Sequence, residues 1–435
     1  MLRSQKVDQV GVRSMADTPD QRFIPLRRRD VVELCLADGD FDAENRTHFE
    51  ELCRLLAAVF HFEYHEVLER LKDAYVHFSA DRDTEIVRAL SAEERRQAHR
   101  DLVAELRQLL DAANYEEVTE GDLDLALEAE SLLEVRLHVD FDDFEDVAFF
   151  RRGGRARHET VRRLVVFKRD IEFVNYDRVL IYVHFKDRSH FEAQGRDPDA
   201  LPFVPGATIL KLFQDVPRPD LEMLFPNTEV RMRPVDKLII GVPAVVGGAV
   251  VVATKLLASL GVLLVLLGVW LGVSDATVQV DQAQLVGLGA GLGAIGGFLF
   301  KQLTKFKNRK IRFMKTLADN LYFKNLDNDS GVIHHLLDQA EEEETKEAIL
   351  AYWWLLTHGP RSVAVLDREL EDWLGGHCAS RPDFEVDDAV AKLDRLGLVK
   401  SDGELRRAVD LEEAKSVVDR RWDAYFTFDD TTAPR

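Results

Sequence analysis

The sequence predicts an α+β membrane protein with an N-terminal helical region, a β-rich α+β domain, two transmembrane helices and a C-terminal winged-helix-like helical domain. Two apolar runs predict the spans: residues 238–273 contain Lys255 as their only charged residue, and residues 285–300 contain no polar side chain. A bilayer core of roughly 30 Å needs about 20 helical residues, so both runs are candidates. Apolar residues at a period of two within 133–217, flanked by helical patterns on both sides, predict the α+β part.

The composition is consistent with a membrane part that is a minority of the chain. Hydrophobic residues make up 46% and charged residues 31% of 435 residues, a length that suggests two or three domains. The formal net charge of −21 argues against a nucleic-acid partner, because the phosphate backbone would repel the protein. Cys35, Cys53 and Cys378 are odd in number and lack CxxC spacing, which predicts reduced thiols and neither a disulfide framework nor a zinc site.

The first part of the chain is predicted to be helical. Residues 1–21 lack the apolar core of a signal peptide and are expected to form a disordered lead-in. Within 22–115, Ser91 and Glu94 have capping-box spacing, and leucines recur at helical intervals from Leu52. His61 and His65 are four residues apart, but an HExxH motif is absent, so a helix surface is the preferred interpretation over a metal site.

Residues 116–237 are predicted to form an α+β domain with antiparallel strands, and Gly153-Gly154 marks a hairpin turn. A basic patch stands out here in an acidic protein. It could bind anionic lipid, a phosphorylated ligand or an acidic partner domain, or it could pair with the acidic run at 140–146 within the chain. The patch consists of Arg151, Arg152, Arg155, Arg157, Arg162 and Arg163.

The membrane region is expected at 238–300. It divides into an interfacial segment 238–254 bent at Pro243, a span 255–273, a loop 274–284 and a span 285–300. Basic residues flank the region on its outer sides, whereas the loop carries Asp275 and Asp281. By the positive-inside rule this predicts an integral, multi-pass membrane protein with both termini in the cytoplasm.

Glycines in the second predicted span suggest close packing. Gly289, Gly293 and Gly297 recur at four-residue spacing, which lets two spans, or two copies of the chain, approach closely. The GxGxxG at 291–296 lacks the strand that a dinucleotide site requires, and no cofactor is expected. The following juxtamembrane segment, 301–330, is basic and predicts contacts with anionic lipid. These candidate contacts are Lys301, Lys305, Lys307, Arg309, Lys310, Arg312 and Lys315.

Residues 331–428 are predicted to form a winged-helix-like helical domain, from three helical patterns followed by a short hairpin and a last helix. The helix that would read DNA, FEVDDAVAKLDRL, is acidic where phosphates would lie. A protein-interaction or packing module is therefore expected.

Three blocks resemble the transmembrane protein 143 family, which is built on a domain of unknown function. They are RFIPLRRRD (22–30), LFQDVPRPDLEMLFPNTEVRMRPVDK (212–237) and NLYFKNLDNDSGVIHHLLDQAEEEETKEAILAYWWLL (320–356). The resemblance extends over residues 22–375. It implies a two-span membrane protein of bacteria and eukaryotic organelles and brings no catalytic residues.

The functional expectation is a membrane-anchored scaffold or regulatory protein whose soluble domains bind membrane lipid, a protein partner or a second copy. The alternatives are a membrane-tethered hydrolase or lipid-modifying enzyme and, more weakly, an oligomeric channel. GxSxG, HExxH, CxxC and P-loop motifs are all absent from the sequence. His334-His335 beside the glutamates at 341–344 is the only concentration of histidine and acid, and a helix dipole accounts for these glutamates. No catalytic or metal-binding residue is therefore assigned.

Overall fold

The computed structural model describes residues 21–82, 84–119, 121, 136–163, 167–231, 271, 321–379 and 381–426, with scattered helical positions between 282 and 318. The chain divides into two compact units. Unit 1 comprises residues 1–129, 141–226 and 324–435, and unit 2 comprises residues 130–140 and 227–323.

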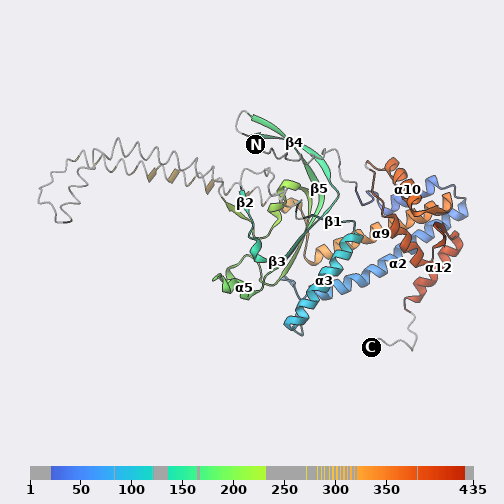
Figure 1. Cartoon of the computed structure of the whole chain (residues 1–435), viewed down its shortest axis with the longest axis horizontal. Helices are drawn as coiled ribbons and strands as arrows, with labels where there is room; N and C mark the ends of the chain where they lie inside the picture. The colour runs from blue at the N-terminus through green and yellow to red at the C-terminus, as the bar shows by residue number, and fades with distance from the viewer. Residues whose placement is uncertain are drawn as a thin grey trace, which may run out of the picture. The chain divides into compact units, whose positions relative to one another are not determined.

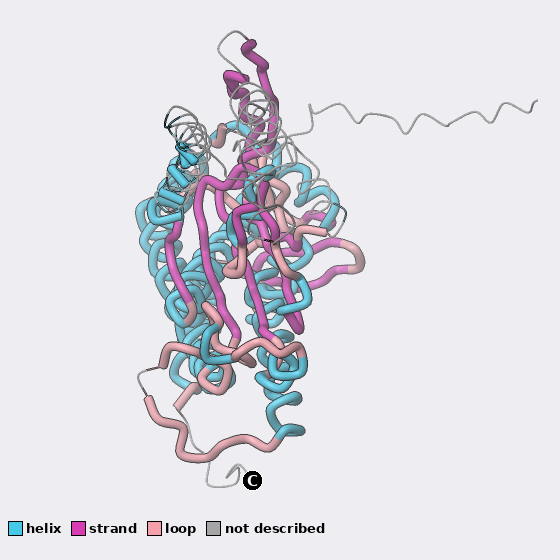
Figure 2. Tube along the Cα trace, turned by 90° about the vertical axis from the view of Figure 1, so that its left-hand side faces the viewer, coloured by secondary structure: helices cyan, strands magenta, loops and turns pink. Residues whose placement is uncertain are grey.

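Unit 1 contains a six-stranded antiparallel sheet with the order β1-β3-β5-β6-β8, and β4 pairs with β5 (Figure 2). The central strand β5 pairs with β4 along its first half and with β3 and β6 along its second half. Successive side chains of a strand point to opposite faces, and Leu180 and Ile181 are both buried, so β5 is covered on both faces. The strands are β1 (Glu116–Glu117), β3 (Phe144–Arg152), β4 (Arg155–Arg163), β5 (Phe167–Phe185), β6 (Thr208–Pro217) and β8 (Asn325–Asn328).

Helices cover one face of this sheet. The end of α2 (Ala43–Tyr75), α3 (Ala92–Ala112) and the first turns of α9 (Ser330–His358) share a core with β3, β5 and β6. Across the strands, Phe150 lies opposite Leu180, and Leu180 lies opposite Leu212, which places one apolar row under the helices. A capping box at Ser91 and Glu94 begins α3, as the sequence indicates.

Aromatic rings fill the opposite face. Phe225 contacts Phe144 and Phe149 at centroid distances of 5.8 and 5.0 Å, and Phe203 stacks on Phe185 at 4.0 Å. The chain returns over this face through a short helix and two 3-10 turns. These are α5 (Arg188–Ala193), η2 (Pro198–Ala200) and η3 (Arg218–Leu224).

A second core of unit 1 is built almost entirely from helices. Its members come from α1, α2, the second half of α9, α10, α11 and α12, and Cys35 and Cys53 are buried in it as free thiols. Beginning with α9, the chain follows the helix-strand-helix-helix-hairpin order of a winged helix, with a three-stranded sheet β10-β11-β9. The elements are α1 (Arg28–Asp38), β9 (Arg361–Ser362), α10 (Val363–His377), α11 (Val386–Leu396), β10 (Val399–Asp402), β11 (Leu405–Ala408) and α12 (Leu411–Ala424).

Two long helices belong to both cores. The first half of α9 contributes to the sheet core and its second half to the helical core, and α2 does the same in the reverse direction. Figure 1 shows both helices running between the sheet and the group that contains α10 and α12. Helix α1 and the first half of α2, from the predicted region 22–115, therefore share the helical core with helices of the predicted region 331–428, whereas α3 packs on the sheet.

Unit 2 contains a two-stranded antiparallel sheet of β2 (Arg136–His138) and β7 (Glu229–Arg231). Beside this pair, the amide of Asn227 donates a hydrogen bond of 2.7 Å to the carbonyl oxygen of Asp140. The scattered helical positions between 282 and 318 that the structure describes are exposed.

The predicted membrane architecture needs correction. In the described part of the chain no helix combines the length and the apolar character that crossing a bilayer requires. Charged residues recur along α2, which buries only part of its surface, and through the middle turns of α9, although α9 is buried on every side from Ala348 to Leu355. This finding contradicts the two-span fold class and the integral-membrane location; the structure supports an α+β protein. Segments 238–254, 255–273 and 274–284, except Leu271 and Gln282, and most positions of 285–300 lie outside the described residues.

Gly153 provides a test of the turn between β3 and β4. Its φ is +66°, and a Cβ placed on it would lie 2.6 Å from Oδ2 of Asp177 and 3.0 Å from Cε1 of Phe23. Gly403, at φ +63°, has no atom within 4 Å of such a Cβ. We expect Gly403→Ala to lower the free energy of unfolding by about 1 kcal/mol from backbone strain alone. Gly153→Ala should cost clearly more, because a collision adds to that strain; equal losses in chemical denaturation would contradict this account.

Candidate functional site

The middle turns of α9 carry a run of charged residues, EEEETKE at 341–347, between the two apolar cores. Glu343, Lys346 and Glu347 are each less than 5% exposed. A buried charge is costly unless a charge of opposite sign and hydrogen bonds compensate for it. The partners of these groups therefore determine which segments must lie against α9.

Glu343 and Lys346 hold the segment before α1. The Glu343 carboxylate accepts hydrogen bonds from Nη2 of Arg152 at 2.6 Å, from Nζ of Lys346 at 2.9 Å and from the backbone N–H of Ile24 at 3.0 Å. Lys346 Nζ also donates to the carbonyl oxygens of Ile24 and Leu26, at 2.7 and 3.1 Å. Glu343, Arg152 and Lys346 thus connect β3 and the segment before α1 to α9.

On its other side α9 faces Lys392 of α11. Lys392 Nζ lies 2.9 Å from Glu344, 3.0 Å from Glu347 and 2.5 Å from Asp388, so one ammonium group serves three carboxylates. Asn114 donates a further hydrogen bond of 3.1 Å to Glu347. Burial raises the pKa of Glu347 to about 7, and it also raises the pKa of Glu344. Burial therefore disfavours the charged form of both carboxyls, and the ammonium group of Lys392 offsets this only in part.

A cavity of about 290 Å³ opens next to Glu344, between α2, α3, α9 and α11. Its walls combine apolar side chains with ion pairs. Tyr64 lies against Glu344, and burial raises the pKa of its hydroxyl far above the ordinary range. The lining residues are Phe60, Glu63, Tyr64, Val67, Arg70, Glu105, Gln108, Leu109, Ala112, Glu344 and Arg395.

Glu63 organises the rim of this cavity. Both of its oxygens accept hydrogen bonds from Arg395, at 2.8 and 2.9 Å, and one of them also accepts from Tyr425 at 2.9 Å and from Arg421 at 3.3 Å. Burial alone would raise the pKa of Glu63, but the hydrogen bonds and charge of Arg395 outweigh it and lower the pKa. At this rim, Glu63 of α2 is thus bonded to Arg395 of α11 and to Arg421 of α12.

Next to this rim lies an aromatic patch that is partly open to solvent. Phe62 of α2 contacts Tyr425 at a centroid distance of 4.4 Å, Phe426 at 5.3 Å and Trp422 at 6.3 Å. Trp422 is 37% exposed and Phe426 is 63% exposed. We refer to Phe62, Trp422, Tyr425 and Phe426 as the aromatic patch.

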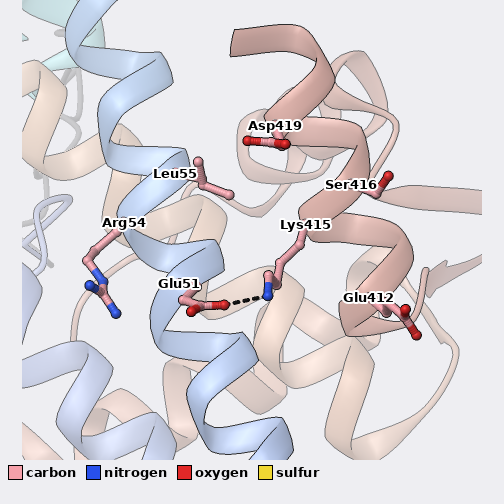
Figure 3. Close-up of a pocket in the computed structure, with 7 residues that line it drawn as sticks. All are labelled: Glu51, Arg54, Leu55, Glu412, Lys415, Ser416 and Asp419. Carbon is pink, nitrogen blue, oxygen red and sulfur yellow. Dashed lines mark hydrogen bonds and ion pairs between the residues drawn. The ribbon is translucent and has the colours of Figure 1, made fainter. Parts of the chain in front are cut away.

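A groove of about 570 Å³ lies between α2 and α12, with charged groups along both walls (Figure 3). Glu51 accepts a hydrogen bond from Lys415 across it, and this bond and the charge of Lys415 lower the pKa of Glu51. The groove is lined by Glu51, Arg54, Leu55, Glu412, Lys415, Ser416 and Asp419.

A histidine pair packs α3 against the sheet. The rings of His99 and His184 lie 4.1 Å apart and are tilted by 31°. His99 Nε2 lies 2.6 Å from the Tyr182 hydroxyl, and His184 Nδ1 lies 2.9 Å from Oγ1 of Thr208. Burial, together with the neighbouring His99, lowers the pKa of His184 to about 3. The pair is therefore uncharged at neutral pH and contributes packing between α3, β5 and β6.

The predicted basic patch is distributed over several partners. Arg151 donates a hydrogen bond to Glu116 at 2.6 Å, and Arg152 donates one to Glu343 at 2.6 Å. Arg155 lies 3.0 Å from Asp177, and Arg157 lies 3.5 Å from Asp215. Arg162 and Arg163 end β4, and their side chains are outside the described residues. Binding of an anionic ligand by this set remains a prediction.

The other predicted residues lie in unit 2. Lys301, Lys307 and Lys315 are exposed, whereas Lys305, Arg309, Lys310 and Arg312 fall outside the described residues, so their lipid contacts remain a prediction. At Gly289, Gly293 and Gly297 no described atom lies within 4 Å of an added Cβ. Close packing on another helix or copy is therefore also left as a prediction.

Two histidines form hydrogen-bonded pairs with single acidic side chains. His61 Nδ1 lies 2.8 Å from Glu341, and His335 Nδ1 lies 2.7 Å from Asp327. Within the described ranges no group of three or more His, Cys, Asp or Glu side chains is arranged to hold a metal ion.

Sequence reasoning missed the buried charges of α9 and α11 and the cavity beside them. It singled out neither Lys392 nor Glu63 as a functional group, and it placed Asn114 within the helical region 22–115. The signal that could have found them is Lys392 on an apolar stripe of α11, with Ala389 and Leu393 buried beside it, where a lysine needs a buried acid.

A family model described as a protein of unknown function, DUF3754, matches residues 176–331. No solved structure matches the chain. A domain of unknown function is therefore present, and it covers the second half of β5, β6, unit 2 from β7 onward, β8 and the first two residues of α9.

Lys392 provides a test of the buried network. We expect Lys392→Met to lower the free energy of unfolding by about 3–5 kcal/mol, because three carboxylates would remain without their ammonium partner. Lys400→Met removes an exposed ion pair with Glu413 and should cost less than about 1 kcal/mol. Chemical denaturation of both variants checks this; similar losses would show that the network does not stabilise the fold.

Glu347 provides a pH test. Because its folded pKa lies above its unfolded value, the folded protein binds the extra proton, and stability falls as pH rises from about 4.5 to about 7. Glutamine does not titrate, so the stability of Glu347→Gln should rise relative to that of the parent protein as the pH increases across that window. Unfolding measured at pH 5, 6, 7 and 8 checks this, with exposed Glu404→Gln as control. A difference independent of pH would contradict the prediction.

Proposed function

We propose that this chain is a non-enzymatic scaffold or regulatory protein that binds a protein partner through the surface formed by α2 and α12. The observation that carries the proposal is the aromatic patch, in which Trp422 and Phe426 remain substantially exposed although they contact Phe62. Exposed aromatic clusters are uncommon on surfaces without partners and are enriched at binding sites.

The surroundings of the patch support the same function. The Glu63 rim, with two arginines and a tyrosine hydroxyl, lies on one side, and the charged groove of Figure 3 lies between the same two helices. An apolar centre with a polar, charged rim is the usual composition of a protein interface. The net charge of −21 favours a basic partner, which long-range attraction would steer to this protein.

The enzyme and channel alternatives gain no specific observation from the described residues. The buried acids and bases of α9 pair with one another and with groups of neighbouring segments, and His99 and His184 contribute packing. We also propose that the chain is related to the transmembrane protein 143 family. The three sequence blocks that resemble this family support the proposal, whereas the family match at 176–331 supports only a domain of unknown function.

The double substitution Trp422→Ala and Phe426→Ala tests the proposal. Full-length protein and variant would be used for affinity capture from the source cells with quantitative mass spectrometry, and for sedimentation to measure self-association. We expect the variant to lose a bound partner, or self-association, by at least tenfold, because interface aromatics dominate binding energy.

The control is Val204→Ala, which truncates an exposed apolar residue outside the patch. It should retain binding, and circular dichroism should show the same folded state for all three proteins. Identical capture and sedimentation of the parent protein and the double variant would reject the proposed surface.

A further inference from the structure

The inner end of the 290 Å³ cavity carries more negative than positive charge. Glu344 lines the cavity and is 12% exposed, and the Tyr64 hydroxyl donates a hydrogen bond to it. It shares the single ammonium group of Lys392 with buried Glu347 and with Asp388, which is 53% exposed. Between the two buried carboxylates, Glu344 and Glu347, like charges that share one counterion repel each other strongly. A second cation at Glu344 would relieve this repulsion.

The other cations at the cavity are already held by acids. Arg395 directs two nitrogens to Glu63, and Arg70 donates to Glu105 at 2.9 Å. Each of these guanidinium groups therefore has a partner at the rim. Glu344 is the acid of the cavity wall whose ammonium partner is shared, and its other partner, Tyr64, is uncharged.

The walls suit a short aliphatic chain. Phe60, Val67, Leu109 and Ala112 supply apolar surface between the rim and Glu344. A volume of about 290 Å³ is at the lower end of small-molecule sites, which start near 300 Å³. The space fits one long side chain better than a drug-sized ligand.

We propose that this cavity binds a primary alkylammonium group, and that its physiological ligand is a lysine side chain of the partner protein. The ammonium group would donate hydrogen bonds to the Glu344 carboxylate, and its methylene chain would pack against Phe60 and Leu109. This inference rests on the proposed function in naming the source of the lysine. The cavity chemistry itself is independent of the aromatic patch.

Titration of the full-length protein with small probes tests the inference. Binding of n-butylamine and of Nα-acetyl-lysine amide would be measured by nuclear magnetic resonance or calorimetry at pH 7. Both should bind, and n-butanol and the Nε-acetylated lysine amide should bind at least tenfold more weakly, because they lack the positive charge. Equal binding of charged and uncharged probes would overturn the proposal.

Two variants locate the site. Glu344→Gln should reduce amine affinity at least tenfold, and Ala112→Leu, which fills the cavity and keeps every charge, should do the same. Exposed Glu404→Gln should bind like the parent protein. Retained affinity in folded Ala112→Leu would place the amine elsewhere and reject the cavity.

The remaining arms separate this inference from the function on which it rests. If n-butylamine binds and the lysine amide does not, the ligand is a free amine and the lysine assignment is overturned. If amine binding depends on Glu344 while the aromatic-patch variant keeps all partners, the cavity is supported and the partner-binding surface fails.

Discussion

The fold of unit 1 depends on the charged turns in the middle of α9. They lie where the sheet core ends and the helical core begins, and water is excluded from both sides. Glu343 and Lys346 pair within α9, and the remaining bonds of these charges reach other segments, so Arg152 from β3, Lys392 from α11 and the backbone before α1 are brought to one place. Apolar burial supplies most of the stabilisation, whereas these ion pairs determine which segments meet.

This arrangement makes one helix responsible for two cores. The first turns of α9 pack on the sheet, and its second half shares a core with α10, α11 and α12. The cavity lies where the two cores meet, with Leu109 of the sheet core and Phe60 of the helical core in its walls, and the aromatic patch lies on the helical side. Their geometry is therefore set by contacts that reach back to the sheet, and neither is a feature of a single helix.

The sequence predicted local features of unit 1 well. The capping box at Ser91, the hairpin glycines at 153–154 and the helix-helix-hairpin order after α9 all follow from short-range patterns. It failed where distant segments meet. The partners of Arg152 and Lys392 lie 191 and 45 residues away, and spacing along a chain carries no information about such pairs. The apolar runs at 238–273 and 285–300 drove the membrane interpretation, which the described helices contradict.

The central strand has a consequence for the boundaries of the family match. The match begins at Tyr176, in the middle of β5, and ends at Gly331, in the first turn of α9. A fragment cut at these limits would keep β6 and lose β3, α3 and nearly all of α9, which cover Leu180 and Leu212. The apolar rows that contain Leu180 and Leu212, which are buried in the intact chain, would then be exposed to water. The matched segment thus lacks part of the core in which its own strands are buried, and expression of the segment alone would yield an incomplete core.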